Sequence, residues 1–268
     1  DSDKNLIFEW NAWDHLNIAN YNYINLSAGF IMWMHGNSIE IDEDSNIIIS
    51  NRISSEVIKL DRDNGQVIWI LGGANNQFTI INDDHNGFSR QHDVRRLENG
   101  NLLLFDNGND HEPPISRAVE YELDETNMTA NLVWDFSHPE GYVGLAMGSA
   151  QRLPNNNTLI NWGRLEEQIG VVTEVDQDKN IVLDLKYTDP VYCYRVTKHE
   201  WQFDTNLILG DTNLDDKVDI IDLSIIADHF AEEGSNLDIY HLYRFDVNRD
   251  RNIDHSDIDT LAEMIIGL

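Results

Sequence analysis

The sequence predicts an all-β chain that forms part of a β-propeller, followed by a small α-helical domain built around two calcium loops. Three observations favour this fold class. A block of about 55 residues recurs three times, and each copy alternates apolar and polar residues as half-buried strands do. Two loops of the form D-x-N-x-D then follow one another after residue 210. No convincing helical pattern interrupts the repeated part.

The repeat is clearest in three segments that each indicate a hairpin. They are NSIEIDEDSNIIISNR (37–52), HDVRRLENGNLLLFDNG (92–108) and GSAQRLPNNNTLINWG (148–163). Asn46, Asn101 and Asn157 occupy equivalent positions, 55 and then 56 residues apart. A second pair of strands follows each hairpin, and four strands per repeat are typical of a propeller blade. A β-sandwich with regular strand spacing is the alternative, but the in-register repeat favours the propeller.

The repeats account for three four-stranded blades, preceded by a lead-in strand NLIFEWNAW at residues 5–13. Propellers close with about four to eight blades, so three blades leave two open sheet edges. We therefore expect further blades, from the same longer chain or from another chain, to complete the ring. The expected domains are residues 1–208 for the propeller part and 209–268 for the helical part.

The composition restricts the partners of the chain. There are 48 acidic against 18 basic residues, a net charge of -30, and such a field repels nucleic acid and anionic membrane surfaces. No apolar run reaches the roughly 18 residues that a membrane span needs. The one cysteine, Cys193, rules out an internal disulfide.

Two acidic loops, DTNLDDKVDIID (211–222) and DVNRDRNIDHSD (246–257), lie 35 residues apart and match each other. Alternate side-chain oxygens at this spacing wrap a calcium ion, and position 7 contributes a backbone carbonyl. The expected ligands are Asp211, Asn213, Asp215, Asp219 and Asp222 in the first loop, and Asp246, Asn248, Asp250, Asp254 and Asp257 in the second. An acidic solvated linker is the alternative.

Apolar residues at helical spacing follow each loop, and the loops depart from the ideal in two ways. The apolar residues are Leu223, Ile226 and Phe230, then Ile258, Leu261 and Ile265. Position 6, normally glycine, is Asp216 in one loop and Arg251 in the other, and position 12 is Asp rather than Glu.

With this duplicated loop–helix arrangement, residues 210–268 resemble a type I dockerin, the calcium-bound module that docks into cohesin domains. The resemblance implies two Ca²⁺ ions, a cohesin-like protein partner and an extracellular or cell-surface location. Loop positions 10 and 11 face the partner in that family. They are Ile220 and Ile221 in one loop but His255 and Ser256 in the other, which argues against symmetrical docking. A purely structural calcium module is the alternative.

The candidate site residues lie where strands enter the repeat. Equivalent positions of successive blades ring the central channel of a propeller, and Asn37, His92 and Gly148 share one such position. His35 stands just before it, and Arg52 ends the first hairpin. A guanidinium binds oxyanions by a two-pronged contact, and an imidazole can act as acid, base or nucleophile near neutral pH. A structural histidine is the usual alternative, and the repeat register favours function.

Several stretches together resemble the arylsulfotransferase family over residues 5–202. They are HGNSI, IISNR, VIWILGG, FSRQHDVRRLENGNLLLFDNG, SRAVEYELD and GSAQRLPNNNTLINWG. The resemblance implies a six-bladed propeller that moves a sulfuryl group from a phenolic sulfate ester to a phenol. The family uses a sulfated histidine and no nucleotide sulfate donor. It also has a further histidine in an earlier blade, which is not in this chain.

The motifs assign roles to four residues by resemblance. His92 in QHD matches the nucleophilic histidine, and Arg52 in SNR matches the arginine that binds the sulfate. His35 and Asn37 in HGNS match residues that hold the sulfuryl oxygens and assist proton transfer. The resemblance implies no cofactor at this site. The alternative is a non-catalytic extracellular propeller that binds or supports other molecules, with the calcium-loaded tail as its connector.

Overall fold

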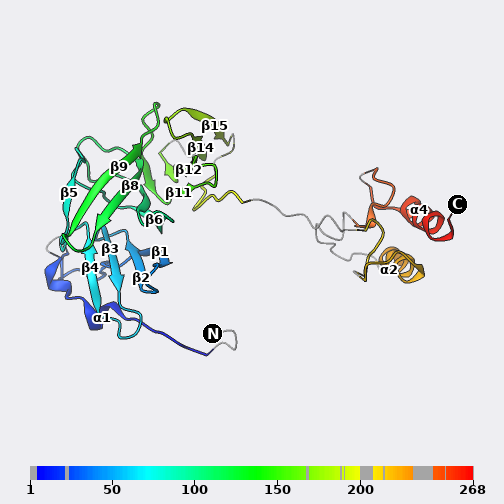
Figure 1. Ribbon diagram of the computed structural model, residues 1–268, viewed down its shortest axis with the longest axis horizontal. Coiled ribbons are helices and arrows are strands. Elements are labelled where there is room, and N and C mark those ends of the chain that lie inside the picture. The colour runs from blue at the N-terminus through cyan, green and yellow to red at the C-terminus, as the bar shows by residue number, and fades with distance from the viewer. Residues whose placement is uncertain are drawn as a thin grey trace. The chain divides into compact units, whose positions relative to one another are not determined.

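A computed structural model describes residues 5–21, 24–166, 169–187, 189, 191–199, 208–213, 215–231, 244–250 and 252–267. The chain divides into two compact units, Asp1–His199 and Glu200–Leu268. The first unit is built mainly of strands, and the described part of the second includes helices α2 and α4 (Figure 1). Within the described residues, no helix is long and apolar enough to cross a membrane.

Three larger sheets dominate the first unit, and each contains four antiparallel strands in chain order. Sheet 1 contains β1 (Gly36–Ile41), β2 (Ile47–Asn51), β3 (Glu56–Leu60) and β4 (Val67–Leu71). Sheet 2 contains β6 (His92–Arg96), β7 (Leu102–Asp106), β8 (Arg117–Asp124) and β9 (Thr129–Phe136), with β5 (Thr79–Ile81) parallel to β9 at its edge. Sheet 3 contains β11 (Ser149–Arg152), β12 (Thr158–Asn161), β14 (Val171–Val175) and β15 (Ile181–Lys186).

The predicted repeat of two hairpins per sheet is confirmed. The sheets do not close into a ring, and the described strands of one sheet do not pair with those of another. The sequence pattern missed β5, and it missed a two-stranded ladder of β10 (Gly144–Ala146) with β13 (Arg164–Leu165). Both additions are only two or three residues per strand, too short to show a period of two.

Sheet 2 lies between the other two sheets, and the apolar run of β7 shows why. Leu102 and Leu104 pack with residues of sheet 1, whereas Leu103 and Phe105 pack with residues of sheet 3. All four side chains are fully buried. Successive side chains of a strand point to opposite faces, so a continuous apolar run fits a strand covered on both sides.

The lead-in strand expected at residues 5–13 is wrong. The described part of the segment forms no strand, and it continues into α1 (Ala12–His15) and the 3-10 helix η1 (Ile18–Asn20). Phe8, Trp10 and Leu16 pack on sheet 1, and the Trp10 indole N–H donates to the Gly65 carbonyl at 3.0 Å. The apolar residues of this segment thus cover a sheet face instead of joining a ladder.

The second unit contains α2 (Ile220–Ala231) and α4 (His255–Ile266), each beginning inside an acidic loop. Ile226, Phe245, Val247 and Leu261 form its buried core. The six apolar residues predicted at helical spacing all belong to this cluster, so that prediction is confirmed. In α4 the side chain of Asp254 caps the helix N-terminus, as an aspartate does well in this position.

Candidate active site and calcium loops

His35 directly precedes β1, and its backbone is fixed on both sides. The buried Asn51 side chain accepts a hydrogen bond from the His35 N–H at 2.7 Å, and the Arg52 N–H donates to the His35 carbonyl at 2.9 Å. The pairing of β1 with β2 is irregular between Gly36 and Ser38. His35 and Arg52 are therefore held opposite each other at one end of the first hairpin.

Several hydrogen bonds join this hairpin to β6 of sheet 2 and to the residue before it, and two of them lie beside the candidate site. The Asn37 amide donates to the Gln91 carbonyl at 2.7 Å, and the Val94 N–H donates to the Ser38 hydroxyl oxygen at 3.0 Å. Strands β1 and β6 accordingly lie side by side. Asn37 is thus anchored to the residue that immediately precedes His92.

His92 begins β6, and its side chain is enclosed, with 2% of the residue exposed. Its Nδ1 lies 2.6 Å from Oδ1 of Asn107, and the Met147 N–H donates to its Nε2 at 3.2 Å. The Tyr194 ring packs edge-on against the imidazole, with 6.2 Å between the centroids. Because a backbone N–H only donates, Nε2 is the nitrogen that carries the lone pair.

The surroundings hold His92 neutral. Burial lowers the pKa of His92 from 6.5 to about 4, the hydrogen bond with Asn107 opposes this shift, and the charges of Arg52 and His35 add to it. Burial, and then the charge of Arg52, also lower the pKa of His35. Both imidazoles are therefore uncharged at neutral pH, and the nearby guanidinium helps to keep them so.

Arg52 is a partly buried cation that makes no ion pair with the described residues. Its Nη2 donates to the Leu145 carbonyl at 2.8 Å, and its Nε is buried with no hydrogen-bond partner there. Burial, and then the charge of Arg90, lower the pKa of Arg52, while Asp110 opposes the shift. A partly buried guanidinium without a carboxylate, and with its buried Nε–H left as a free donor, favours an anionic ligand.

The other arginines around His92 are paired with carboxylates. They are Arg90 with Asp110 at 2.8 Å, Arg95 with Glu40 at 2.8 Å, and Arg96 with Asp42 at 2.7 Å. Asp93 has a left-handed backbone with φ 56°, and the register of β6 shifts between His92 and Arg95, so simple strand alternation does not hold there. Arg52 alone among these four cations lacks such a partner in the described part of the chain.

The four residues chosen from the sequence come together at the junction of sheets 1 and 2. His35, Asn37 and Arg52 come from one end of the β1–β2 hairpin, and His92 comes from the start of β6. Oδ1 of Asn37, like Nε of Arg52, is buried and has no hydrogen-bond partner among the described residues. Buried polar atoms are normally paired, so these two leave room for a polar ligand.

Sequence reasoning missed Asn107, although the repeat contained a signal for it. Asn107 stands six residues after Asn101, as Arg52 stands six residues after Asn46, so the two occupy equivalent positions of successive repeats. Asn107 is fully buried and contacts His92 directly. The repeat register therefore places Asn107 at the position that Arg52 occupies in the first repeat.

Tyr194 and Arg195 were also missed, and no repeat position marks them. Tyr194 packs on His92, while Arg195 donates to the Asn37 carbonyl at 3.2 Å and pairs with Asp93 at 2.8 Å. Both residues follow sheet 3 in the chain, where the backbone runs back to the start of β6. Only the folded arrangement reveals that return.

The depressed pKa of His92 predicts the pH dependence of a reaction that needs its lone pair. We expect kcat/KM to stay level as the pH falls from neutral and to reach half its plateau value near pH 4, because protonation removes the lone pair. The measurement is kcat/KM against pH, with circular dichroism to confirm folding at each point. A decline centred on 6.5, the ordinary histidine value, would contradict the assignment.

The two acidic loops of the second unit have matching internal hydrogen bonds. In the first, Asp222 accepts from the backbone N–H groups of Asn213 at 3.2 Å and Asp219 at 2.9 Å. In the second, Asp257 accepts from Asn248 at 3.2 Å and Asp254 at 2.9 Å. The duplication seen in the sequence is therefore also a duplication of backbone geometry.

The donor chemistry of the loops fits a hard cation, since the side chains contribute only oxygen. Asp216 at position 6 has a left-handed backbone with φ 64°, the conformation for which this position normally uses glycine. Arg251, its counterpart, lies outside the described residues. No three His, Cys, Asp or Glu side chains of the described chain are arranged to hold a metal, so binding is expected to draw the loop carboxylates together.

Comparison with known proteins gives two family matches. Residues 1–195 match the arylsulfotransferase (ASST) family, and residues 209–266 match the dockerin type I domain. The arylsulfate sulfotransferase AssT of Escherichia coli O6:H1 is 31% identical over 143 residues, covering 41% of this chain and 24% of that protein. The protein of the same name from Lelliottia amnigena is 29% identical over 143 residues, with the same coverage.

A solved streptogramin B lyase structure matches with a TM-score of 0.35 and 13% identity, over 63% of this chain and 44% of that one, which is too distant to bear on the fold. The chain spans about a quarter of the length of the curated relatives it matches. The family match nevertheless covers the whole strand-rich unit up to residue 195, including the site at the junction of sheets 1 and 2. The chain belongs to the arylsulfotransferase family and carries a dockerin type I domain at residues 209–266.

Proposed function

We propose that the complete protein transfers a sulfuryl group from a phenolic sulfate ester to a phenol, with His92 as the covalent carrier. The observation that supports this most is the pairing of a buried neutral imidazole with a nearby guanidinium that has no carboxylate. An imidazole lone pair can attack sulfur, and a cation beside it can bind the anionic ester.

In the first step, Nε2 of His92 forms a bond to sulfur and the bond from sulfur to the aryl oxygen breaks. The electron pair of that bond stays on oxygen, which leaves as phenolate. Arg52 and the second N–H of the Asn37 amide, whose first N–H donates to the Gln91 carbonyl, bind the sulfuryl oxygens, whose negative charge is spread as in phosphoryl transfer. In this structure Nε2 of His92 accepts from the Met147 N–H, and Nη2 of Arg52 donates to the Leu145 carbonyl. The substrate therefore displaces these two backbone contacts when it binds.

In the second step, the acceptor phenol attacks the sulfur of sulfated His92. Its hydroxyl proton passes to neutral His35, the new sulfur–oxygen bond forms, and the electron pair of the nitrogen–sulfur bond returns to Nε2. His35, whose pKa is lowered, then releases that proton to solvent, and the phenolate released in the first step takes one up, so no net proton is gained or lost. The lowered pKa of His35 suits a base that works at neutral pH.

The proposal refers to the complete protein because this chain covers only part of its relatives. We infer that sheets 1 to 3 are successive propeller blades and that blades from the longer chain, or from another chain, complete a ring of six. Strands β1, β6 and β11 lie in sequence beside one another, as the inner strands of neighbouring blades do.

A covalent carrier has a direct test. The complete protein mixed with a chromogenic aryl sulfate, without an acceptor, is expected to release a burst of about one phenol per protein molecule. Mass spectrometry at neutral pH is expected to find one sulfuryl group on the peptide that contains His92. Transfer to a phenol with neither a burst nor a modified peptide would exclude the covalent route. Absence of any transfer would favour the non-catalytic binding or structural propeller.

We further propose that each acidic loop binds one Ca²⁺ and that the loaded unit docks a cohesin-like protein at the cell surface or outside the cell. The ligands would be the ten loop residues named from the sequence, together with one backbone carbonyl per loop. Ile220 and Ile221 support a docking surface, because they are 65% and 51% exposed despite being apolar. His255 and Ser256 are exposed at the equivalent positions of the second loop.

Removal of calcium is expected to destabilise the second unit. A ligand present at a hundred times its Kd stabilises the folded state by about 2.7 kcal/mol per site, so a chelator should lower the melting temperature clearly. Isothermal titration is expected to find two ions in the parent and one in Asp215→Ala. Asp228→Ala, which changes an exposed aspartate of α2 outside the loops, is the control. A melting temperature that the chelator leaves unchanged would refute both sites.

A further inference from the structure

We infer that Asn107 is a positioning residue that fixes the tautomer of His92, so that Nε2 faces the site as the free nucleophile. This inference rests on the proposed function of His92. Two neighbouring carbonyl groups determine the orientation of the Asn107 amide. The Asn107 Nδ2 donates to the Gly144 carbonyl at 2.8 Å and to the Met147 carbonyl at 3.0 Å.

The two carbonyls on one side of the Asn107 amide identify its nitrogen and its oxygen. A carbonyl only accepts, so the NH₂ group must face Gly144 and Met147, and Oδ1 must face His92. An amide oxygen also only accepts, so the Nδ1 of His92 that lies 2.6 Å from it must carry the proton. The remaining nitrogen, Nε2, then has the lone pair.

The contact at the other side of the ring points to the same tautomer. The Met147 N–H donates to Nε2 at 3.2 Å, which requires an unprotonated Nε2. Asn107 holds the carbonyl of that same residue, so it acts on both nitrogens of His92, directly at one and through Met147 at the other. Once Nε2 is sulfated the ring becomes cationic, and the oxygen of Asn107 then stabilises the Nδ1–H.

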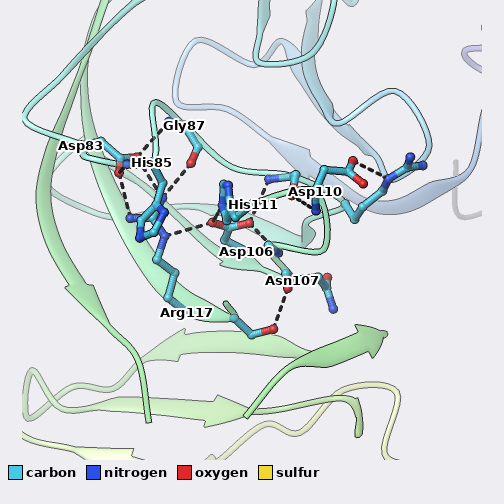
Figure 2. Close-up of polar contacts among 12 residues, drawn as sticks. Asp83, His85, Gly87, Asp106, Asn107, Asp110, His111 and Arg117 are labelled. Carbon is cyan, nitrogen blue, oxygen red and sulfur yellow. Dashed lines mark hydrogen bonds and ion pairs between the residues drawn. The ribbon is translucent and has the colours of Figure 1, made fainter. Parts of the chain in front are cut away.

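Asn107 is itself held rigidly at the end of β7. Its backbone carbonyl accepts from the Ser116 hydroxyl at 2.6 Å. The preceding Asp106 pairs with the buried Arg117 at 3.0 Å, and Arg117 pairs with Asp83 at 2.9 Å. Figure 2 shows this ion-pair cluster directly beside Asn107. Positioning residues need such support, because a small shift of the ring would misdirect the lone pair.

The tautomer can be measured without any catalysis. The chain labelled with ¹⁵N in its ten histidine rings is examined by long-range ¹H–¹⁵N correlation, and the signals of His92 are identified by their loss in His92→Gln. We expect the parent to carry the proton on Nδ1. We expect Asn107→Leu, which has a similar size but no acceptor, to move the proton to Nε2. Asn107→Asp, which keeps an oxygen toward Nδ1, is expected to retain the parent tautomer.

The matched control is Asn109→Leu. The Asn109 amide donates to the same Gly144 carbonyl at 3.0 Å and to the Asn107 backbone carbonyl at 3.4 Å, but it makes no hydrogen bond with the His92 ring, so its loss should leave the tautomer unchanged. In the complete protein, Asn107→Leu is expected to lower kcat by about 10²- to 10⁴-fold, the range associated with a wrong histidine tautomer, and Asn107→Asp is expected to recover part of it.

Two results would overturn the inference. One is an Nε2–H tautomer in the parent, which can be observed even if Asn107→Leu does not fold. The other is an Nδ1–H tautomer that persists in Asn107→Leu. Failure of the proposed function appears differently, as an absence of sulfuryl transfer by the parent with the tautomer results intact.

Discussion

His92→Ala is expected to lower kcat for sulfuryl transfer by the complete protein about 10⁴-fold or more. The substitution removes the atom that forms the covalent bond, and loss of a nucleophile is among the largest single effects known in enzymes. The measurement is phenol release from an aryl sulfate, with and without an acceptor phenol. The burst expected of the parent should disappear together with turnover.

The control for this prediction is His85→Ala, which removes an exposed histidine that does not contact the site. His92 is almost fully buried, so its truncation leaves a cavity, and the melting temperature of each variant must be compared with that of the parent. A folded His92→Ala protein that turns over as fast as His85→Ala would show that another group carries the sulfuryl transfer.

Arg52→Ala is expected to lower kcat/KM about 10²- to 10³-fold, which is the usual effect of removing one donor from the charge developing in a transition state. Arg52→Lys should recover little of this loss. Lysine keeps the charge, but it is a point donor that cannot make the two-pronged contact of a guanidinium with an oxyanion.

Arg95→Lys is the matched control for Arg52. Arg95 is also partly buried near His92, but it is paired with Glu40 and Asp93 instead of being open to an anion. We therefore expect kcat/KM of Arg95→Lys to remain near the parent value. Equal losses in Arg52→Lys and Arg95→Lys would mean that Arg52 contributes only general positive charge.

The sequence was informative wherever local rules decide structure. The spacing of Asn46, Asn101 and Asn157 predicted three sheets of two hairpins each, because turn residues and strand alternation are local signals. Phe8 and Trp10 led to the wrong prediction of a lead-in strand. An apolar pattern shows that a segment is buried, but it does not show whether the segment pairs with a strand. Strand β5 was invisible because three residues hold too little pattern.

Within the candidate site, the sequence predicted only those residues that the repeat register or a family motif marks. The register placed Asn37 and His92 at one equivalent position, and the structure brings their neighbourhoods together. Asn107 was predictable in position but not in role, because its role comes from Gly144 and Met147, which lie in the following loop. Tyr194 and Arg195 depend on a return of the chain after sheet 3, which no local pattern encodes.

The candidate site lies at the junction of two sheets, and this has an evolutionary consequence. One repeat is a natural unit of gene duplication, yet the proposed chemistry needs residues from two neighbouring repeats, with Arg52 in one and His92 in the next. Recombination that exchanged whole repeats would preserve the architecture and lose the reaction whenever it separated these two partners.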